Sequence, residues 1–256
     1  IGFTKSIEAA AYRIVHSPLK LDDQGVWRMD FEDMECKLAQ NHIHAAVFCS
    51  PHNPCGRVWE RWELERAMEV YAANDCLVIS DEIWSDIIMP GHKHIPTQSV
   101  SEDARMRTVA LYAPSKTFNM PGVAASHTFI HNEVLRERFV NYLDAGELNA
   151  GHVFAWPAVT AAYTEGEEWL AQCLAYIQGN IDYVADYVGT HIPKMKVMRP
   201  QASYLIWLDC RELGLSHEDL NAFFVDKAGL ALNDGEMFGK EGAGFMPVSY
   251  THLRAH

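Results

Sequence analysis

Residues 108–119 read TVALYAPSKTFN, an apolar run that leads directly into a turn carrying one lysine. The run 108–112 shows no alternation of polar and apolar side chains, which is typical of a strand buried in a parallel sheet. Pro114 marks the turn that follows, so Lys116 lies just beyond the predicted strand. A single lysine in a turn is usually an exposed loop residue, and that interpretation stays open at this point.

Buried strands separated by helices recur upstream of this segment. The apolar runs 45–49 and 76–79 are predicted strands. Helices are expected over 31–39, opened by Asp30 as N-cap, and over 59–73, where apolar side chains recur at helical spacing. This order predicts an α/β fold with a mostly parallel central sheet covered by helices on both faces. Ligands of such sheets gather at the carboxyl ends of the strands.

Two more polar side chains stand at these predicted strand ends. Asn53 lies in SPHNPCGR (residues 50–57), and Asp81 lies in SDEIW (residues 80–84). Each has an ordinary explanation, because Asn-Pro is a turn signal and an aspartate can cap the first turn of a helix. Glu82, next to Asp81, is expected to be a structural or surface partner.

Asparagine, aspartate and lysine in this order are the parts needed to hold pyridoxal phosphate. The amine of Lys116 forms a Schiff base, the carboxylate of Asp81 pairs with the pyridine nitrogen, and the amide of Asn53 hydrogen-bonds the ring hydroxyl. The carboxylate keeps that nitrogen protonated, so the ring accepts the electrons of a substrate carbanion. Once displaced by substrate, the lysine is placed to act as general base. Ser115 is a candidate cofactor contact, although serine is also a plain turn residue.

The pattern of elements changes near residue 157. A long helical stretch is expected over 158–188, interrupted at Gly166 and Gly179. The elements predicted after it are strands at 196–198 and 204–208 and a helix over 216–227. We therefore predict a large cofactor-binding domain, residues 1–157, and a smaller α+β domain, residues 158–256.

The composition narrows the class of protein. A net charge of -13 argues against a nucleic-acid surface, which needs clustered Lys and Arg. No apolar run approaches the roughly 18 residues of a membrane span, and the first residues carry no signal-peptide pattern. The six cysteines form no Cys-x-x-Cys pair, which fits reduced cysteines in a cytoplasmic protein. The histidine pairs 42/44 and 92/94 lack further ligands at zinc spacing, so no metal is predicted.

The three quoted blocks resemble the signature blocks of fold-type I pyridoxal-phosphate enzymes, the class I/II aminotransferase superfamily. With His52 and the segment GHKH (residues 91–94), they resemble most closely the cysteine-S-conjugate (cystathionine) β-lyases of the MalY/PatB type. The resemblance runs from about residue 18 to residue 246. It implies the type I PLP-dependent transferase fold and pyridoxal 5′-phosphate as cofactor.

The resemblance also implies roles for individual residues. It assigns Lys116 as the covalent anchor of the cofactor, Asp81 as the partner of the pyridine nitrogen and Asn53 as a contact of the ring oxygen. Tyr204 resembles a segment that approaches the substrate, although a core position in a strand explains it equally well. A homodimer is expected for the complete protein, because active sites of this family lie between two subunits.

Both ends of the chain depart from the family pattern. No glycine-rich phosphate loop precedes Asn53, so we expect the chain to be truncated at its N-terminus relative to the family. After GAGFM (residues 242–246) the family places an arginine that pairs with the substrate carboxylate, whereas this chain has Pro247. The tail 247–256 is expected to be atypical, and Arg254 is a poor substitute. We expect weaker binding of cofactor and substrate as a result.

The function implied by the resemblance is a β-elimination on an amino-acid thioether, which releases a thiol, pyruvate and ammonia. An aminotransferase would use the same three residues. Broader aminotransferases commonly carry a hydroxyl three positions before the lysine and an arginine eight positions after it, where this chain has Ala113 and Ala124. This difference favours the lyase branch. A regulatory binding protein on the same scaffold and an inactive fragment remain alternatives.

Overall fold

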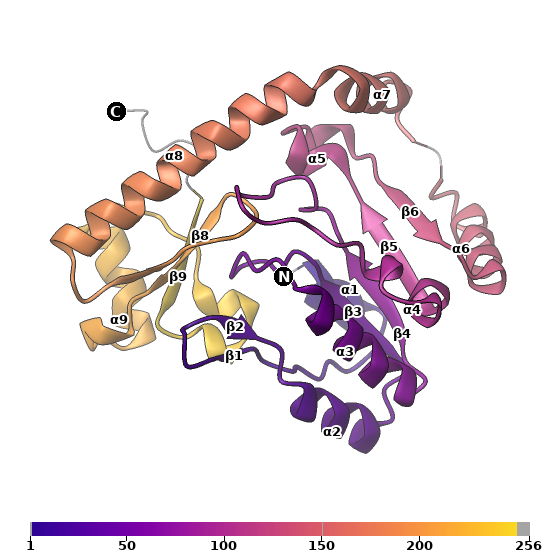
Figure 1. Cartoon of the computed structure of the whole chain (residues 1–256), viewed down its shortest axis with the longest axis horizontal. Helices are drawn as coiled ribbons and strands as arrows, with labels where there is room; N and C mark the ends of the chain where they lie inside the picture. The colour runs from indigo at the N-terminus through magenta and orange to yellow at the C-terminus, as the bar shows by residue number, and fades with distance from the viewer. Residues whose placement is uncertain (1, 150, 250–256) are drawn as a thin grey trace.

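The computed structural model describes residues 2–149 and 151–249 and contains a four-stranded sheet (Figure 1). Its strands are β3 (Ala45–Cys49), β4 (Leu77–Asp81), β5 (Thr108–Tyr112) and β6 (His127–Ile130), in that order across the sheet. The first three run parallel and β6 is antiparallel at the edge. The predictions for 45–49 and 108–112 are confirmed. The strand predicted at 76–79 begins one residue later and continues to Asp81, which is its last residue.

Helices α2 (Phe31–Asn41), α3 (Arg61–Ala73) and α4 (Glu102–Arg107) pack near this sheet. Asp30 caps α2 as predicted, because its side chain accepts a hydrogen bond from the backbone N–H of Asp33. Helix α3 starts two residues later than predicted. Glu60 and Glu63 form a capping box there, in which each side chain accepts from the other residue's backbone N–H.

The two faces of the sheet are covered unequally. Phe48 and Val78 are buried in one cluster with Leu64 and Met68 of α3. Val47, Ile79 and Val109, whose side chains alternate to the opposite face, are only half-buried. The expectation of complete cover on both faces is therefore met on one face only.

A second layered unit follows in the C-terminal part of the chain. Helices α7 (Ala155–Glu165) and α8 (Glu167–His191) are separated at Gly166, as predicted. Gly179 does not interrupt α8, because it lies on the exposed side of the helix where the backbone remains regular. The small antiparallel sheet contains β7 (Lys196–Met198), β8 (Leu205–Asp209) and β9 (Phe245–Ser249), with β8 in the middle. Helix α9 (His217–Ala222) continues as a π-helical turn to Lys227.

Pro247 lies inside a regular strand. It is buried in β9, opposite Trp207 of β8. Among the described strands, β9 pairs only with β8, so it is an edge strand. An edge strand tolerates proline because its outer side needs no backbone N–H donor for a neighbouring strand. Pro247 therefore does not interrupt the strand, which continues to Ser249. Arg254 and residues 250–256 lie outside the described residues.

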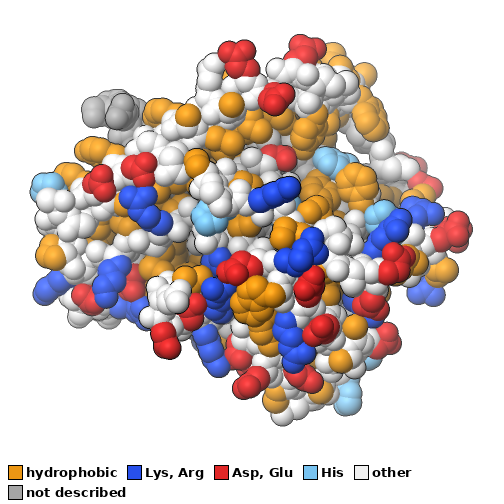
Figure 2. All heavy atoms as spheres, viewed as in Figure 1, with side chains coloured by type: hydrophobic (Ala, Val, Ile, Leu, Met, Phe, Trp, Pro, Cys, Tyr) orange, Lys and Arg blue, Asp and Glu red, His pale blue; other side chains and the backbone are white. Residues whose placement is uncertain are grey.

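The remaining described elements are short or peripheral. They are α1 (Gly2–Ala9), β1 (Lys20–Leu21), β2 (Trp27–Arg28), α5 (Pro114–Thr117), α6 (Glu133–Ala145) and several 3₁₀ turns. Figure 2 shows acidic and basic side chains interspersed over one face, with hydrophobic side chains gathered along its upper edge. Among the described helices, none is both long enough and apolar enough to cross a bilayer.

The four-stranded sheet and the small antiparallel sheet are connected through a close backbone contact at Gly56, in the loop after β3. Its carbonyl oxygen accepts hydrogen bonds from the backbone N–H groups of Gln201 and Ala202, at 2.8 and 3.0 Å. On its other side, the same segment bonds to the chain that follows β4, because Ser203 N–H donates to the carbonyl of Ile87 at 2.9 Å. Residues 200–203 therefore lie between the loop of Asn53 and the segment after Asp81.

Replacing Gly56 with alanine is expected to destabilise the protein by about 3 kcal/mol or more. Gly56 has a φ of +68°, and a Cβ there would lie 2.5 Å from Cβ of Pro200, which has no room to move away. Gly25→Ala is the matched control, since it also has a positive φ (+76°) but nothing within 4 Å of the added carbon. Urea unfolding measures both variants; equal losses of free energy would contradict the close-contact explanation.

Candidate active site

The three predicted residues lie at the ends of three neighbouring strands. Cys49 of β3 pairs in register with Asp81 of β4, and the backbone N–H of Ser50 donates to the Asp81 carbonyl at 3.0 Å. Asn53 lies in the loop that continues from Cys49. Lys116 lies on α5, which begins two residues after β5. The carboxyl ends of these parallel strands thus form one edge that carries all three side chains.

Asp81 is a buried carboxylate at this edge, only 9% exposed. One oxygen accepts a hydrogen bond from the backbone N–H of Ile83 at 3.1 Å, which closes a turn. Residues 83–86 form a hydrogen-bonded turn and no helix follows within the described residues 82–96, so Asp81 caps a turn, a structural role that it can hold together with one toward a cofactor. Burial raises the pKa of the Asp81 carboxyl, while the Ile83 N–H and the positive charge of Lys116 act in the opposite direction.

Lys116 is half-buried and faces an aromatic pair. Its Nζ lies 5.5 Å from the ring centroid of Trp84, within range of a cation–π contact. Trp84 in turn meets Tyr204 edge to face, with ring centroids 4.7 Å apart. Tyr204 and Lys116 thus both contact Trp84, and the alternative of an exposed loop lysine is wrong because Lys116 is half-buried on α5.

Asn53 has an unsatisfied polar atom. Its Oδ1 is buried and has no hydrogen-bond partner. Such an atom costs about 1–3 kcal/mol unless a ligand or water bonds it. Since an amide side chain can rotate by 180°, this position can offer either a donor or an acceptor. Together with a buried carboxylate and a lysine amine, it fits the ring oxygen, ring nitrogen and aldehyde carbon of pyridoxal phosphate.

Ser115 is half-buried on the same turn of α5 as Lys116. Its carbonyl oxygen accepts from the backbone N–H of Met120 at 3.1 Å, which holds the turn closed. Its predicted contact with the cofactor stays a prediction. Of the two positions where broader aminotransferases differ, Ala113 is buried and Ala124 is exposed in a left-handed conformation (φ 50°).

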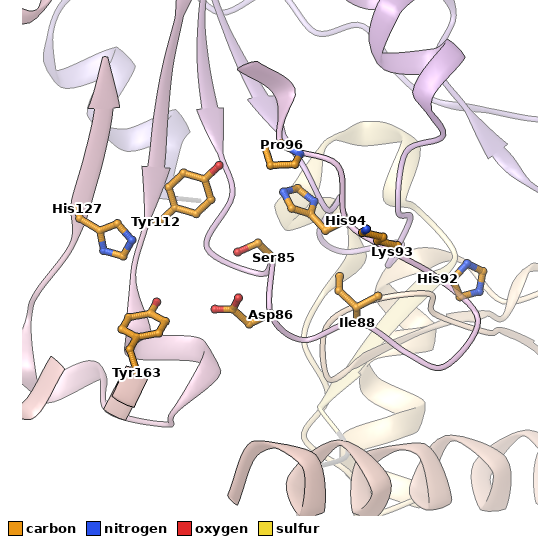
Figure 3. Close-up of a pocket in the computed structure, with 10 residues that line it drawn as sticks. All are labelled: Ser85, Asp86, Ile88, His92, Lys93, His94, Pro96, Tyr112, His127 and Tyr163. Atoms are coloured by element: carbon orange, nitrogen blue, oxygen red, sulfur yellow. The ribbon is translucent and has the colours of Figure 1, made fainter. Parts of the chain in front are cut away.

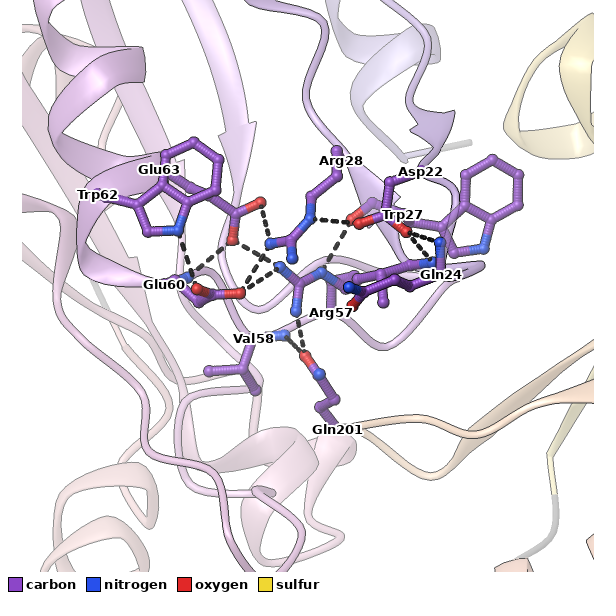
Figure 4. Close-up of polar contacts among 11 residues, drawn as sticks. Asp22, Gln24, Trp27, Arg28, Arg57, Val58, Glu60, Trp62, Glu63 and Gln201 are labelled. Atoms are coloured by element: carbon purple, nitrogen blue, oxygen red, sulfur yellow. Dashed lines mark hydrogen bonds and ion pairs between the residues drawn. The ribbon is translucent and has the colours of Figure 1, made fainter.

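A buried arginine network that the sequence did not predict is centred on Arg57, four residues after Asn53 (Figure 4). Arg57 donates from Nη2 to Glu63 at 2.5 Å, from Nη1 to the Gln201 side chain at 2.6 Å, and from Nε to the Trp27 carbonyl at 2.9 Å. Glu63 is fully buried and also forms an ion pair with Arg28 at 3.1 Å. The available signal was Arg57 itself, four residues after Asn53 in an otherwise apolar and turn-rich block.

His52, next to Asn53, is a second group that sequence reasoning left without a role. Its Nδ1 lies 3.1 Å from Sγ of Cys55, and its ring meets Trp59 edge to face. Burial lowers the pKa of His52 to about 4, with a smaller contribution from the charge of Arg57. The imidazole is therefore neutral at pH 7 and packs as part of the loop.

A cavity of about 470 Å³ has Asp86 and Tyr112 among its lining residues (Figure 3). Asp86, on its wall, accepts a hydrogen bond from the Thr117 hydroxyl at 2.9 Å. Since Thr117 follows Lys116, this bond holds the lysine-bearing turn. Asn53, Asp81 and Lys116 are not among the residues that line this cavity. Their amide, carboxylate and amine match the groups of pyridoxal phosphate, so they and not the cavity define the candidate cofactor site.

Comparison with known proteins identifies the family. Residues 4–252 match the family model of aminotransferase class I and II, and the chain belongs to this family. It is similar to the cystathionine beta-lyase PatB of Bacillus subtilis, with 39% identity over 96% of this chain and 64% of that protein. It is also similar to protein MalY of Escherichia coli, with 32% identity over 97% of this chain and 63% of that protein.

Solved structures give the same result for the fold. Cystalysin from Treponema denticola, which contains pyridoxal 5′-phosphate, matches with a TM-score of 0.90 at 33% identity. The PLP-bound C–S lyase from Staphylococcus hominis matches with a TM-score of 0.88 at 29% identity. Each match covers 97% of this chain and 63% of the other. The type I transferase fold is thus confirmed, and the chain spans slightly less than two thirds of the length of these relatives.

Replacing Arg57 with methionine is expected to destabilise the protein by about 3 kcal/mol or more, because it leaves Arg28 as the one remaining charged partner of the buried Glu63 among the described ion pairs. Arg105→Met is the matched control: Arg105 pairs with Glu102 on the surface, where a pair contributes about 0.5 kcal/mol. Chemical denaturation compares the two. The double variant Arg57→Met, Glu63→Leu should recover part of the loss; similar losses in the two single variants would argue against a structural role for Arg57.

Acid is expected to weaken the fold through His52. Its pKa is about 4 in the folded protein and near 6.5 when unfolded, so the unfolded state takes up the proton first as pH falls. The contribution of neutral His52 to the unfolding free energy is fully present above pH 6.5. About 2 kcal/mol of it is lost as the pH falls from 6.5 to 4, a value reduced because the ring is partly exposed. His52→Gln should flatten the pH dependence of the unfolding free energy in that window, whereas His131→Gln, at an exposed site, should leave it unchanged.

Proposed function

We propose that this chain is the cofactor-bearing part of a pyridoxal-phosphate-dependent carbon–sulfur β-lyase. The substrate would be cystathionine or another cysteine S-conjugate, and the products a thiol, pyruvate and ammonia. One observation carries the proposal: Asp81, a buried carboxylate, ends β4, and Lys116, a half-buried amine, stands on α5 just after the neighbouring parallel strand β5. The similarity to PatB at 39% identity supports the same activity.

Each residue of the site has a task in this reaction. Bound pyridoxal phosphate would supply an electron-withdrawing ring that accepts the electrons of the substrate Cα–H bond. Lys116 would hold the cofactor and then take the α-proton on its Nζ. Asp81 would bind the ring nitrogen and keep it protonated. Asn53 would bind the ring oxygen through its unpartnered amide position.

Three further residues belong to the proposed site. Tyr204 and Trp84 form an aromatic wall beside the lysine, where a substrate side chain could pack. Ser115 remains a candidate cofactor contact. Pro247 cannot supply the carboxylate contact that arginine would make in this family, so substrate binding by this chain would depend on other groups.

An aminotransferase is the second candidate, because it uses the same lysine, aspartate and asparagine. The buried Ala113 offers no hydroxyl three positions before Lys116, which favours the lyase. A regulatory protein on this scaffold, or a fragment without activity, would retain the fold but not need the lysine.

The setting of the complete protein is also a proposal. We propose a cytoplasmic homodimer, supported by the family membership and by six cysteines that are all free thiols. The proposed division at residue 157 is supported by two separate buried clusters, one around α3 and the other around α8. The second cluster also contains Trp84, Ile87 and Met89, which tie the segment after β4 to the C-terminal unit.

Lys116→Ala is expected to abolish release of pyruvate and thiol from cystathionine, because neither the covalent anchor nor the base remains. Lys93→Ala is the matched control, since Lys93 is an exposed lysine in the neighbouring loop. Incubation of the wild-type chain with cystathionine and added pyridoxal 5′-phosphate measures both products.

Other outcomes of this assay identify the alternatives. Exchange of keto acid with glutamate, without thiol release, would indicate an aminotransferase. Activity that survives Lys116→Ala would contradict the proposed site. A wild-type chain that never forms a lysine-bound cofactor, as judged by visible absorbance, would favour the regulatory or inactive alternatives.

A further inference from the structure

Glu82 is a fully buried carboxylate that the proposed reaction does not use. It follows Asp81 directly and is 0% exposed. Its Oε1 accepts hydrogen bonds from the Ser80 hydroxyl at 3.0 Å and the Thr97 backbone N–H at 3.1 Å. A buried charge persists only where its oxygens are bonded, so these contacts maintain the carboxylate inside the protein.

The other oxygen of Glu82 reaches two rings on different segments. Tyr112 donates its hydroxyl to Oε2 at 2.7 Å, and Nε2 of His94 lies 2.6 Å from the same oxygen. Both rings line the cavity beside α5, where Figure 3 shows them turned toward each other. Nδ1 of His94 is buried without a partner, so Nε2 is the nitrogen that bonds and donates to Glu82.

These contacts join the two strand ends that carry the proposed site. Glu82 is one residue past Asp81, and Tyr112 is four residues before Lys116. The backbone N–H of Glu82 also donates to the carbonyl of Leu111 at 2.9 Å. Two hydrogen bonds, one from backbone and one from side chain, therefore connect the end of β4 to the end of β5 immediately before the lysine turn.

The geometry points to Glu82 as a positioning residue that sets where Lys116 stands relative to Asp81. It acts through Tyr112, with His94 holding the carboxylate from the loop side. Successive side chains along an extended segment point to opposite faces. In this inference Asp81 binds the cofactor, while Glu82, the residue after β4, bonds groups of the protein. This inference rests on the proposed function and deepens it.

Tyr112→Phe is the sharpest test, because it removes one hydroxyl and leaves the ring that stacks on His127 (centroids 5.6 Å apart). Glu82→Gln is a second variant, which keeps the shape of the side chain but presents an amide to Tyr112 and His94. Glu102→Gln is the matched control, an exposed glutamate whose charge pairs with Arg105. All three are compared with the wild-type chain.

Two measurements are made on each variant. Pyridoxal 5′-phosphate is titrated and the visible absorbance of the lysine-bound cofactor is followed against pH. Hydrogen exchange of residues 113–117 is measured in the cofactor-free protein. Tyr112→Phe and Glu82→Gln should weaken cofactor binding about tenfold, as expected for loss of a hydrogen bond to a charged group. They should also shift the pH midpoint of the absorbance and speed the exchange. Glu102→Gln should change none of these.

The pH midpoint separates positioning from simple support of the fold, because general loosening would not alter the protonation of the lysine-bound cofactor. Wild-type cofactor affinity and midpoint in Tyr112→Phe would overturn the inference, even if Glu82→Gln fails to fold. If the wild-type chain binds no cofactor at Lys116, the proposed function fails instead. The hydrogen exchange then still decides whether Glu82 holds the lysine turn: unchanged exchange in Tyr112→Phe overturns that role.

Discussion

The buried guanidinium of Arg57 is the interaction on which the arrangement of the site depends. It bonds Glu63 at the start of α3, the Trp27 carbonyl near the N-terminus and the Gln201 side chain from the C-terminal unit. The five donors of a guanidinium are spread over three nitrogens in one plane and reach partners in different directions, whereas the three donors of a lysine share one nitrogen. Because Gln201 also bonds the backbone at Gly56, the loop that carries Asn53 is held between two parts of the chain.

The same constraint places the aromatic wall. Residues 200–203 bond on one side to Gly56 and on the other to Ile87 and Met89, and Tyr204 follows directly. Tyr204 can therefore meet Trp84 only while this segment stays docked. At the adjacent strand end, Glu82 ties β4 to β5 through Tyr112. Two buried polar networks thus support the proposed site, in which Oδ1 of Asn53 has no hydrogen-bond partner.

Much of the fold could be predicted because its signals are local. The apolar runs at 45–49 and 108–112 became strands at those residues, and Asp30 capped α2. The errors arose where distant contacts override local signals. Gly179 stays helical because its neighbours Ile177 and Ile181 anchor α8 in the core. The tertiary structure also explains why β9 contains Pro247: the strand lies at a sheet edge among the described strands, which is a property of the topology and not of the residue.

The sequence by itself determined the candidate site residues and their order, because asparagine, aspartate and lysine each follow a strand and strand ends of a parallel sheet meet at one edge. The tertiary structure alone decided which charges are buried and what they bond. Arg57 meets Gln201 across 144 positions in the sequence, and Glu82 meets Tyr112 across 30. No local pattern encodes such pairs, since each forms only when packing buries the charged group, Arg57 or Glu82, and brings a polar side chain from a distant segment to it.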